Sequence, residues 1–416
     1  MAQTTYSWRS ESLHGGWSDA NNWWRGYTEA PAGNEYIRFD NNVQTSMTNN
    51  LSATSRFQLW FDSGASSART VTGTSENVFY DYGGTAPKIE NSSSAGHILG
   101  FPIRAGYDNF EINPVNGDLT LSALDLQTYN VLVYGNNAKT LTVRGPLKGS
   151  TGGLTIHQNS TVILQGSPTN SGAMTVNAGV LQYNVNTGTR HTNTILLGAT
   201  SGSDAARVQI GAANVTVSNL VTVRSGSGGT KTMANLSGGQ ARFHGLVTLN
   251  DNLAVSNGAG GSLVFGLMNL GGAQRMLTIP TGHTGLLQGA ISNDGGHGLV
   301  VQGGGELHMG ALNTISSLYI DHGVVGWTNT AAKVQGIIDL GPASGSGDAG
   351  FFVTTANSVV SNQLRSRATS GGRTIQSRNT TGTVTLSGTN ILDAASTVYS
   401  NAAGGVMLLS NQLTGT

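Results

Sequence analysis

The sequence predicts an all-β protein in which short strands stack as the coils of a β-solenoid. Apolar and polar residues alternate over many short runs, which is typical of strands that bury one face. The 60 glycines of this 416-residue chain interrupt nearly every stretch long enough for a helix, and we find no convincing helical periodicity. One segment pattern also recurs along the chain, as expected when equivalent units stack on one another.

The predicted strands are only about three to five residues long and are separated by turns rich in glycine, asparagine and serine. The clearest of them cover residues 141–143, 154–156, 162–164, 174–176, 215–218, 246–249, 277–279 and 384–386. A sandwich of antiparallel strands is the alternative, and it would need tight Asn-Gly or Asp-Gly hairpin turns. Asn-Gly pairs occur at 116–117 and 257–258, but most turns are longer, so the solenoid is favoured.

An internal repeat indicates how the strands are arranged. Residues 166–183 align with residues 310–327 without a gap, and a looser third copy begins at residue 381. A unit of two or three short strands cannot bury its apolar face alone, so we expect the copies to stack in parallel, with about 20 to 25 residues per coil. The copies lie near residues 138–183, 274–327 and 378–410. The aligned apolar residues predict the repeat core, which comprises Val162, Leu164, Met174, Val176, Leu307, Met309, Leu318 and Ile320.

The two ends of the chain differ in aromatic content, since every tryptophan except Trp327 lies in the first 60 residues. Each end of a solenoid presents unpaired backbone groups and an apolar cross-section that must be covered. We therefore expect residues 1–60 to form a cap or assembly segment and residues 61–416 to form the stack. A sugar-binding aromatic platform is the alternative interpretation of these tryptophans. The candidate cap and assembly residues are Trp8, Trp17, Trp23, Trp24 and Phe39 near the N-terminus and Val406, Met407, Leu408 and Leu409 near the C-terminus.

Composition argues against several classes of function. Lys and Arg together number 21, as do Asp and Glu, and these charges are scattered singly, whereas a nucleic-acid-binding protein needs a basic stripe. No apolar run approaches the roughly 18 residues of a membrane span, and the chain carries no recognisable secretion signal. The absence of cysteine excludes disulfides, thiolate-bound zinc and thiol catalysis. We therefore expect no nucleic-acid partner and no membrane insertion.

The best candidate for chemistry is a group of acidic and histidine residues, namely Glu306, His308, Asp321, His322, Asp294 and His297. If Leu307 points inward, Glu306 and His308 point outward on one face, where such groups can act as metal ligands or acid–base catalysts. The first repeat copy has Asn177 where the second has Asp321, so the scaffold does not require that charge. We therefore favour ordinary solvated polar faces and expect no catalytic residue, no metal and no cofactor.

Three segments carry a resemblance to a known family: "STVILQGSPTNSGAMTVNAGVLQ" at 160–182, "GGELHMGALNTISSLYIDHGVVG" at 304–326 and "GTVTLSGTN" at 382–390. They resemble the autotransporter-associated β-strand repeat of passenger-type bacterial surface proteins. The resemblance implies a right-handed parallel β-helix that is exported and displayed outside the cell, and it does not imply catalysis.

These features together predict a non-catalytic extracellular structural protein of a bacterial cell surface. A solenoid with unlike ends can associate head to tail, and heterologous contacts of this kind propagate into open filaments. We therefore expect the chain to bind other copies of itself and to form fibres or a surface layer. One alternative is a monomeric passenger or adhesin that binds glycans or cell surfaces. Another is a β-helix polysaccharide lyase or hydrolase with acids and bases along a groove.

Overall fold

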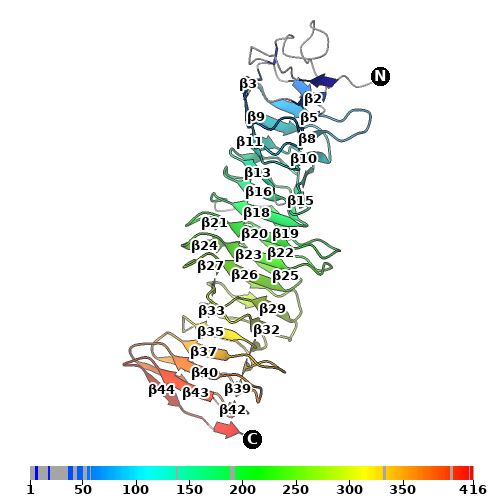
Figure 1. Cartoon of the computed structure of the whole chain (residues 1–416). Coiled ribbons are helices and arrows are strands. Elements are labelled where there is room, and N and C mark those ends of the chain that lie inside the picture. The colour runs from blue at the N-terminus through cyan, green and yellow to red at the C-terminus, as the bar shows by residue number, and fades with distance from the viewer. Residues whose placement is uncertain are drawn as a thin grey trace. The chain divides into compact units, whose positions relative to one another are not determined.

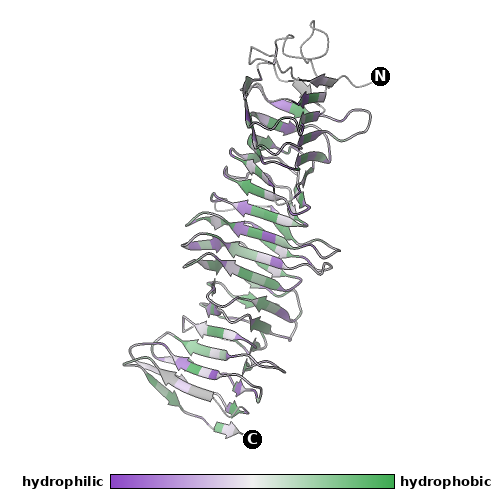
Figure 2. Cartoon of the chain, in the orientation of Figure 1, coloured by the Kyte–Doolittle hydropathy of each residue, from purple (hydrophilic) through white to green (hydrophobic). Residues whose placement is uncertain are grey.

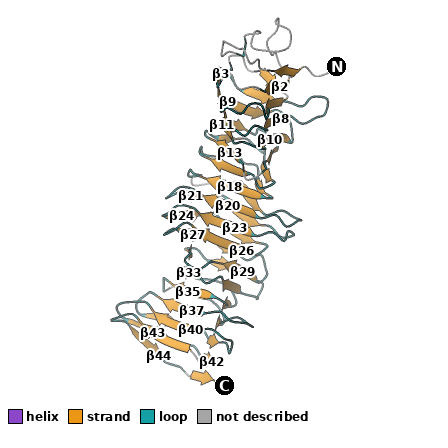
Figure 3. Ribbon diagram, viewed as in Figure 1, coloured by secondary structure: helices purple, strands orange, loops and turns teal. Residues whose placement is uncertain are grey.

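The computed structural model describes residues 5–7, 17–18, 36–40, 45–49, 54–56, 58–136, 139–187, 193–330, 334–393, 397–411 and 413–415. Every regular element in these residues is a β-strand, as Figure 3 shows, so the predicted all-β class is confirmed. The chain divides into two compact units. Unit 1 comprises residues 1–209 and 226–229, and unit 2 comprises residues 210–225 and 230–416. The predicted division at residue 60 falls within unit 1 and stays a prediction.

Unit 1 is a stack of short parallel strands (Figure 1). One sheet contains, in spatial order, β1 (Thr5–Ser7), β2 (Tyr36–Phe39), β5 (Gln58–Phe61), β8 (Lys88–Asn91), β10 (Phe110–Pro114), β12 (Val131–Tyr134), β15 (Leu154–His157), β17 (Met174–Val176) and β19 (Thr194–Leu197). A second sheet contains β3 (Ser46–Thr48), β6 (Arg69–Thr72), β9 (His97–Ala105), β11 (Leu119–Asp125), β13 (Thr140–Val143), β16 (Thr161–Leu164) and β18 (Gly179–Tyr183). The strand order follows the chain order, which is the topology of a β-solenoid.

A third row of unit 1 shares strands with the second sheet. It contains β4 (Thr54–Arg56), β7 (Asn77–Phe79), the ends of β9 and β11, and β14 (Leu147–Lys148). The first part of β9 pairs with β6, and its last three residues pair with β7. In β11 the register against β9 shifts between Leu121 and Ala123. These two strands therefore turn a corner of the coil without leaving extended geometry. β20 (Ala206–Ile210) follows β19 in the sequence and contains the boundary between the two units, which lies between residues 209 and 210.

Unit 2 is also a stack of short parallel strands. One sheet contains β22 (Leu220–Val223), β25 (Val247–Leu249), β28 (Met268–Asn269) and β31 (Ile291–Ser292). A second contains β23 (Lys231–Asn235), β26 (Leu253–Asn257), β29 (Arg275–Thr278), β32 (Leu299–Gln302), β34 (Leu318–Ile320), β36 (Ile338–Leu340), β39 (Leu364–Ser366), β42 (Asn390–Leu392) and β45 (Leu413–Gly415).

Two further sheets complete unit 2. The third sheet contains β21 (Thr216–Val217), β24 (Gln240–Phe243), β27 (Ser262–Phe265), β30 (Thr284–Leu287), β33 (Glu306–Met309), β35 (Gly323–Trp327), β37 (Ala349–Val353), β40 (Arg373–Ser377) and β43 (Thr397–Asn401). The fourth contains β38 (Ser358–Val360), β41 (Thr383–Leu386) and β44 (Val406–Leu409). Neighbouring strands of unit 2, like those of unit 1, pair in parallel.

Stacking in register produces the core of each unit. Leu154, for example, pairs with Val131 on one side and with Met174 on the other, and all three side chains are buried. Hydrogen bonds between neighbouring coils join residues that are, for example, 22 or 28 positions apart. Figure 2 shows hydrophobic and hydrophilic residues alternating along individual strands. The structure places the eight predicted repeat-core residues in this interior: Val162, Leu164, Met174, Val176, Leu307, Met309, Leu318 and Ile320. The predicted parallel β-solenoid is confirmed.

The two aligned repeat copies have the same strand boundaries. β17 and β18 of the first copy correspond residue by residue to β34 and β35 of the second. The second strand begins in each case with a glycine at positive φ, +90° for Gly179 and +118° for Gly323, a conformation that most side chains disfavour. A Cβ at either glycine would also lie within 2.6 Å of a carbonyl oxygen in the coil below. Both glycines are therefore required by the corner that joins the two strands.

Candidate functional site

Trp17, the described member of the N-terminal tryptophan group at 17–24, is buried. It has no exposed surface, and its backbone N–H donates to the carbonyl oxygen of Thr48 over 2.9 Å. Its ring centroid lies 6.0 Å from that of Phe39 and 5.7 Å from that of Phe101. Trp17 therefore packs on the apolar interior and offers no face to a sugar. Trp8, Trp23 and Trp24 lie outside the described residues.

The same aromatic interior holds two basic residues that the sequence reasoning missed. Phe39 stacks on Phe61 with 5.0 Å between ring centroids, and Phe61 stacks on His97 with 4.0 Å. The Arg69 guanidinium lies 5.6 Å from the Phe39 ring centroid, and the Arg69 backbone N–H donates to Nδ1 of His97. Burial lowers the pKa of Arg69 to about 10 and that of His97 to about 3. The signal was available in the sequence, because alternation along β6 turns Arg69 inward together with Val71.

Trp60 presents an aromatic ring on the outer side of unit 1. Its ring lies edge to face with Tyr36 at 5.8 Å, and the guanidinium of Arg38 lies 5.2 Å from its centroid. Nε1 of Trp60 donates to Oγ of Ser92 over 3.1 Å, while Arg38 is paired with Asp62. The hollow beside these rings has a volume of ≈ 120 Å³, below the roughly 300 Å³ at which small-molecule pockets begin. These contacts account for the rings without a ligand.

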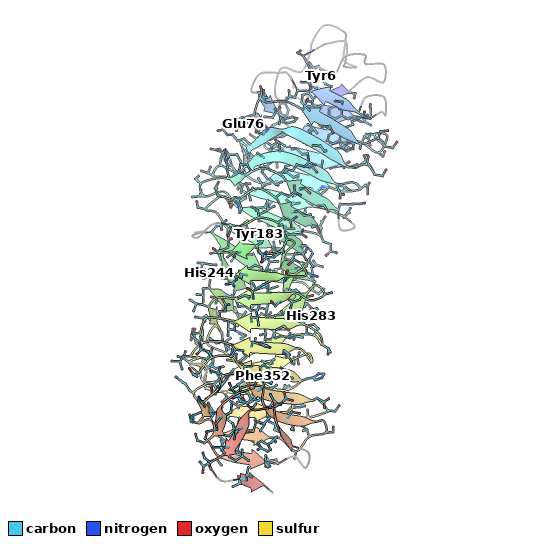
Figure 4. The ribbon with its side chains drawn as sticks, turned by 90° about the vertical axis from the view of Figure 1, so that its left-hand side faces the viewer. Tyr6, Glu76, Tyr183, His244, His283 and Phe352 are labelled. Carbon is cyan, nitrogen blue, oxygen red and sulfur yellow. The ribbon has the colours of Figure 1, made fainter. Side chains whose placement is uncertain are left out.

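The last described coil is open along β44. This strand pairs with β41 in the register that β18 makes with β16, so that Leu386 faces Leu409 as Leu164 faces Tyr183. Tyr183, labelled in Figure 4, is fully buried, whereas Leu409 at the equivalent position is 39% exposed. The four candidate residues of β44, namely Val406, Met407, Leu408 and Leu409, are all exposed or half-buried. In the described part of the chain no strand pairs with the other edge of β44.

Glu306 and His308 are the two members of the acidic and histidine group that contact each other directly. Oε2 of Glu306 lies 2.9 Å from Nε2 of His308. Nη1 of Arg378 donates to Oε1 of Glu306 over 3.1 Å, and this guanidinium lies 3.9 Å from the ring centroid of Phe352. Burial raises the pKa of Glu306, but hydrogen bonds and charges from His308 and Arg378 outweigh burial and hold the pKa below its ordinary value. Glu306 is therefore an ionised, paired carboxylate, unsuited to donating a proton at neutral pH.

Asp294 and Asp321, two other members of the group, have different surroundings. Asp294 accepts hydrogen bonds from the backbone N–H of Gly298 at 2.9 Å and from the Ser316 hydroxyl at 2.6 Å. Burial raises the pKa of Asp294, yet such bonds hold it below its ordinary value. The backbone N–H of His297 donates to the Asp294 carbonyl oxygen, so this segment is a hydrogen-bonded turn. Burial raises the pKa of Asp321. Among the described residues no group of three or more His, Cys, Asp or Glu side chains is arranged to hold a metal ion.

His322 lines a hollow of ≈ 440 Å³ on the outer side of the third sheet of unit 2. Its lining also includes Asp348, Thr374, Gln376 and Arg378, none of which the sequence reasoning selected. These side chains come from β40 and from the segments before β35, before β37 and after β40, in three successive coils. The number of residues per coil varies, so the residues that meet here do not recur at a fixed interval in the sequence.

Comparison with known proteins adds no assignment to these sites. The described residues contain no helix that is long and apolar enough to cross a membrane. No protein-family model matches the chain, and no curated protein or solved structure matches it significantly. The resemblance to the autotransporter-associated repeat therefore stays a prediction, and the parallel β-solenoid is the level at which the chain is classified.

Proposed function

We propose that this protein is a non-catalytic structural building block whose open coil edge pairs with another copy of the chain. The observation that carries the proposal is the exposure of β44. Leu409 occupies an inward position that is fully buried at Tyr183 in the first repeat copy, yet it remains exposed. An unpaired strand edge with apolar residues is a template for pairing with a further strand.

The difference between the covered interior at Trp17 and the open edge of β44 favours head-to-tail assembly over a closed dimer. Trp17 is packed onto the interior near the N-terminus, whereas β44 has no comparable cover among the described residues. When two copies associate through two different surfaces, each pair still has one free surface of each kind. Further copies can therefore add, and a fibre or a layer results. Location outside a bacterial cell is part of the proposal and is based on the resemblance of residues 160–182.

The test compares the purified chain with Leu409→Lys by sedimentation velocity and negative-stain electron microscopy. Lysine at an exposed strand edge opposes strand addition, so we expect fibres or oligomers of the parent chain and loss of them in the variant. Thr385→Lys is the matched control, because Thr385 is half-buried on the outer side of β41, the central strand of the same sheet, which is paired on both edges. A parent chain that stays monomeric at high concentration, or equal assembly by both variants, overturns the proposal.

A further inference from the structure

The hollow on the third sheet of unit 2 is built from side chains of successive coils. We call it the polar groove and define it by His322, Asp348, Gly350, Thr374, Gln376 and Arg378. Its volume of ≈ 440 Å³ lies within the range of about 300–1,000 Å³ that is usual for small-molecule sites. Val324, Gly350 and Thr374 occupy equivalent positions of β35, β37 and β40, and together they form the floor.

Gly350 is a glycine at a strand position whose backbone conformation does not require one. Its φ is not positive, so its backbone conformation is open to any residue. The atoms nearest to a Cβ added there are the two methyl carbons of Val324, both at the tight distance of 3.3 Å, and the Thr374 carbonyl oxygen at 3.6 Å. Gly326 differs, because the ring of Phe352 already fills the space above it. A glycine inside a strand weakens the strand and often marks a place where another group approaches closely. Gly350 thus lowers the floor of the hollow beside the Val324 side chain, where a ligand can approach the backbone.

The lining offers both hydrogen-bond donors and hydrogen-bond acceptors. Nε of Arg378 donates to Oε1 of Gln376 over 2.9 Å, and Nη1 donates to Glu306, which balances the guanidinium charge. Nη2, the third nitrogen of the Arg378 guanidinium, is a further hydrogen-bond donor in the same plane. Oδ1 of Asp348 accepts the backbone N–H of Gly372 at 2.6 Å, which holds the carboxylate at the rim and leaves its second oxygen as an acceptor. A ligand with many neutral hydroxyl groups, each both donor and acceptor, matches this mixture.

Other ligand classes match the polar groove less well. A phosphate or sulfate group needs unpaired cationic or clustered N–H donors, whereas Arg378 is already paired and Asp348 repels an anion. A peptide that adds as a strand needs a free edge, whereas the Gly350 backbone is paired with β35 on one side and with β40 on the other. A metal ion needs at least three suitable ligands, and the described residues show no such group.

We propose that the polar groove binds a neutral oligosaccharide, with the Val324 and Gly350 floor against the C–H face of a sugar ring and with Thr374, Asp348 and Arg378 hydrogen-bonded to its hydroxyls. This site is independent of the assembly proposed above, since the groove lies on a sheet face and β44 is an edge. The proposal assigns recognition to the groove and no bond breaking.

The experiment measures binding by isothermal titration calorimetry with cellohexaose, maltohexaose, laminarihexaose and mannohexaose. Trigalacturonate and inorganic phosphate serve as anionic probes. We expect the parent chain to bind at least one neutral hexasaccharide more tightly than either anion. Gly350→Leu, which fills the floor, should weaken that binding at least tenfold. Gly96→Leu is the control for adding a leucine outside the groove, because a Cβ at Gly96 would meet no atom closer than 3.8 Å and the residue lies in unit 1.

Thr374→Val is a second variant that leaves the floor open. It removes one hydroxyl from the half-buried surface of β40 and should weaken binding several-fold even if Gly350→Leu perturbs the strand. Absence of binding to all four neutral probes overturns the proposal. Preference for trigalacturonate or phosphate also overturns it, as does an affinity that neither Gly350→Leu nor Thr374→Val changes.

Discussion

The ring of Phe352 fills the space above Gly326, the residue paired with it on the neighbouring strand. A Cβ at Gly326 would lie 2.0 Å from Cζ of Phe352, far inside contact distance. Phe352, labelled in Figure 4, is held there on two further sides. The Arg378 guanidinium lies 3.9 Å from its ring centroid, and the His308 ring meets it edge to face at 5.1 Å. The glycine and the aromatic ring thus form one packed unit across β35 and β37.

Replacing Gly326 by alanine should destabilise the protein by about 1–3 kcal/mol, because the added methyl group forces the Phe352 ring out of this position. The free energy of unfolding in urea measures the change. Gly350→Ala is the control on the neighbouring coil, where the new methyl carbon would come no closer than 3.3 Å to the Val324 side chain, against 2.0 Å to Phe352 at Gly326, and should therefore cost less. Adding Phe352→Leu to Gly326→Ala should recover part of the loss. Equal stability of Gly326→Ala and the parent chain would contradict the packing described.

A charge at an inward position of either repeat copy should be severely destabilising. Val176 and Ile320 are fully buried, and Val176→Asp or Ile320→Asp places an unpaired carboxylate among apolar side chains, at a cost of several kcal/mol. Thr175→Asp is the matched control, because Thr175 points outward from the same strand and is only half-buried. Thermal unfolding followed by circular dichroism should separate the inward variants from the control. Similar melting of all three variants would refute the inward assignment.

Trp17→Ala should loosen the first coils of unit 1. Truncating a fully buried aromatic side chain typically costs about 3–5 kcal/mol, and this one contacts both Phe39 and Phe101. Amide hydrogen exchange at β2 and β5 should accelerate, while exchange in unit 2 should change little, because coils of a solenoid contact mainly their neighbours. Tyr107→Ala, at a residue that is 37% exposed, should leave both unchanged. Unchanged protection of β2 after Trp17→Ala would show that the tryptophan is not a cap.

Acid should destabilise unit 1 through His97. Burial, reinforced by the charge of Arg69, lowers the pKa of His97 from 6.5 to about 3. Between these two values the unfolded chain binds a proton that the folded chain does not, so stability falls as the pH falls, by up to about 1.4 kcal/mol per pH unit. Above pH 6.5 the effect is absent. His97→Gln keeps an acceptor for the Arg69 N–H and removes the titration.

The measurement for His97 is the free energy of unfolding at pH 7, 6 and 5 in the parent chain and in His97→Gln. All other titratable groups are the same in both proteins, so the difference between the two slopes of unfolding free energy against pH isolates the contribution of His97. The parent chain should lose stability more steeply than the variant over this range. Identical slopes would mean that His97 is solvated or charged in the folded state.

Local pattern was sufficient to predict the stack but insufficient to predict what meets on its surface. The strands at 154–156 and 174–176 could be read from alternation because a parallel coil only requires each strand to fit its neighbours above and below. The corner within β9 could not be predicted from alternation. This strand is one continuous extended segment, and it belongs to two faces because its first part pairs with β6 and its last part pairs with β7. His322 and Thr374 line the same groove and are two coils apart. Because these two coils differ in their number of residues, no fixed interval in the sequence indicates that the two side chains are neighbours.

The unequal coil lengths also define where this architecture tolerates change. Apart from the register shift within β11, strands keep their register and turns absorb the differences in length. A one-residue insertion in β15 would therefore reverse its inward and outward faces. The turn at 201–204 is exposed, and a Cβ at its Gly202 would meet no neighbour within 4 Å. A peptide inserted there would disturb the hydrogen bond from the Gly228 N–H to the Gly202 carbonyl oxygen and would leave the inward-facing strand residues in register. Turn sequences in this architecture can thus diversify while the interior stays fixed.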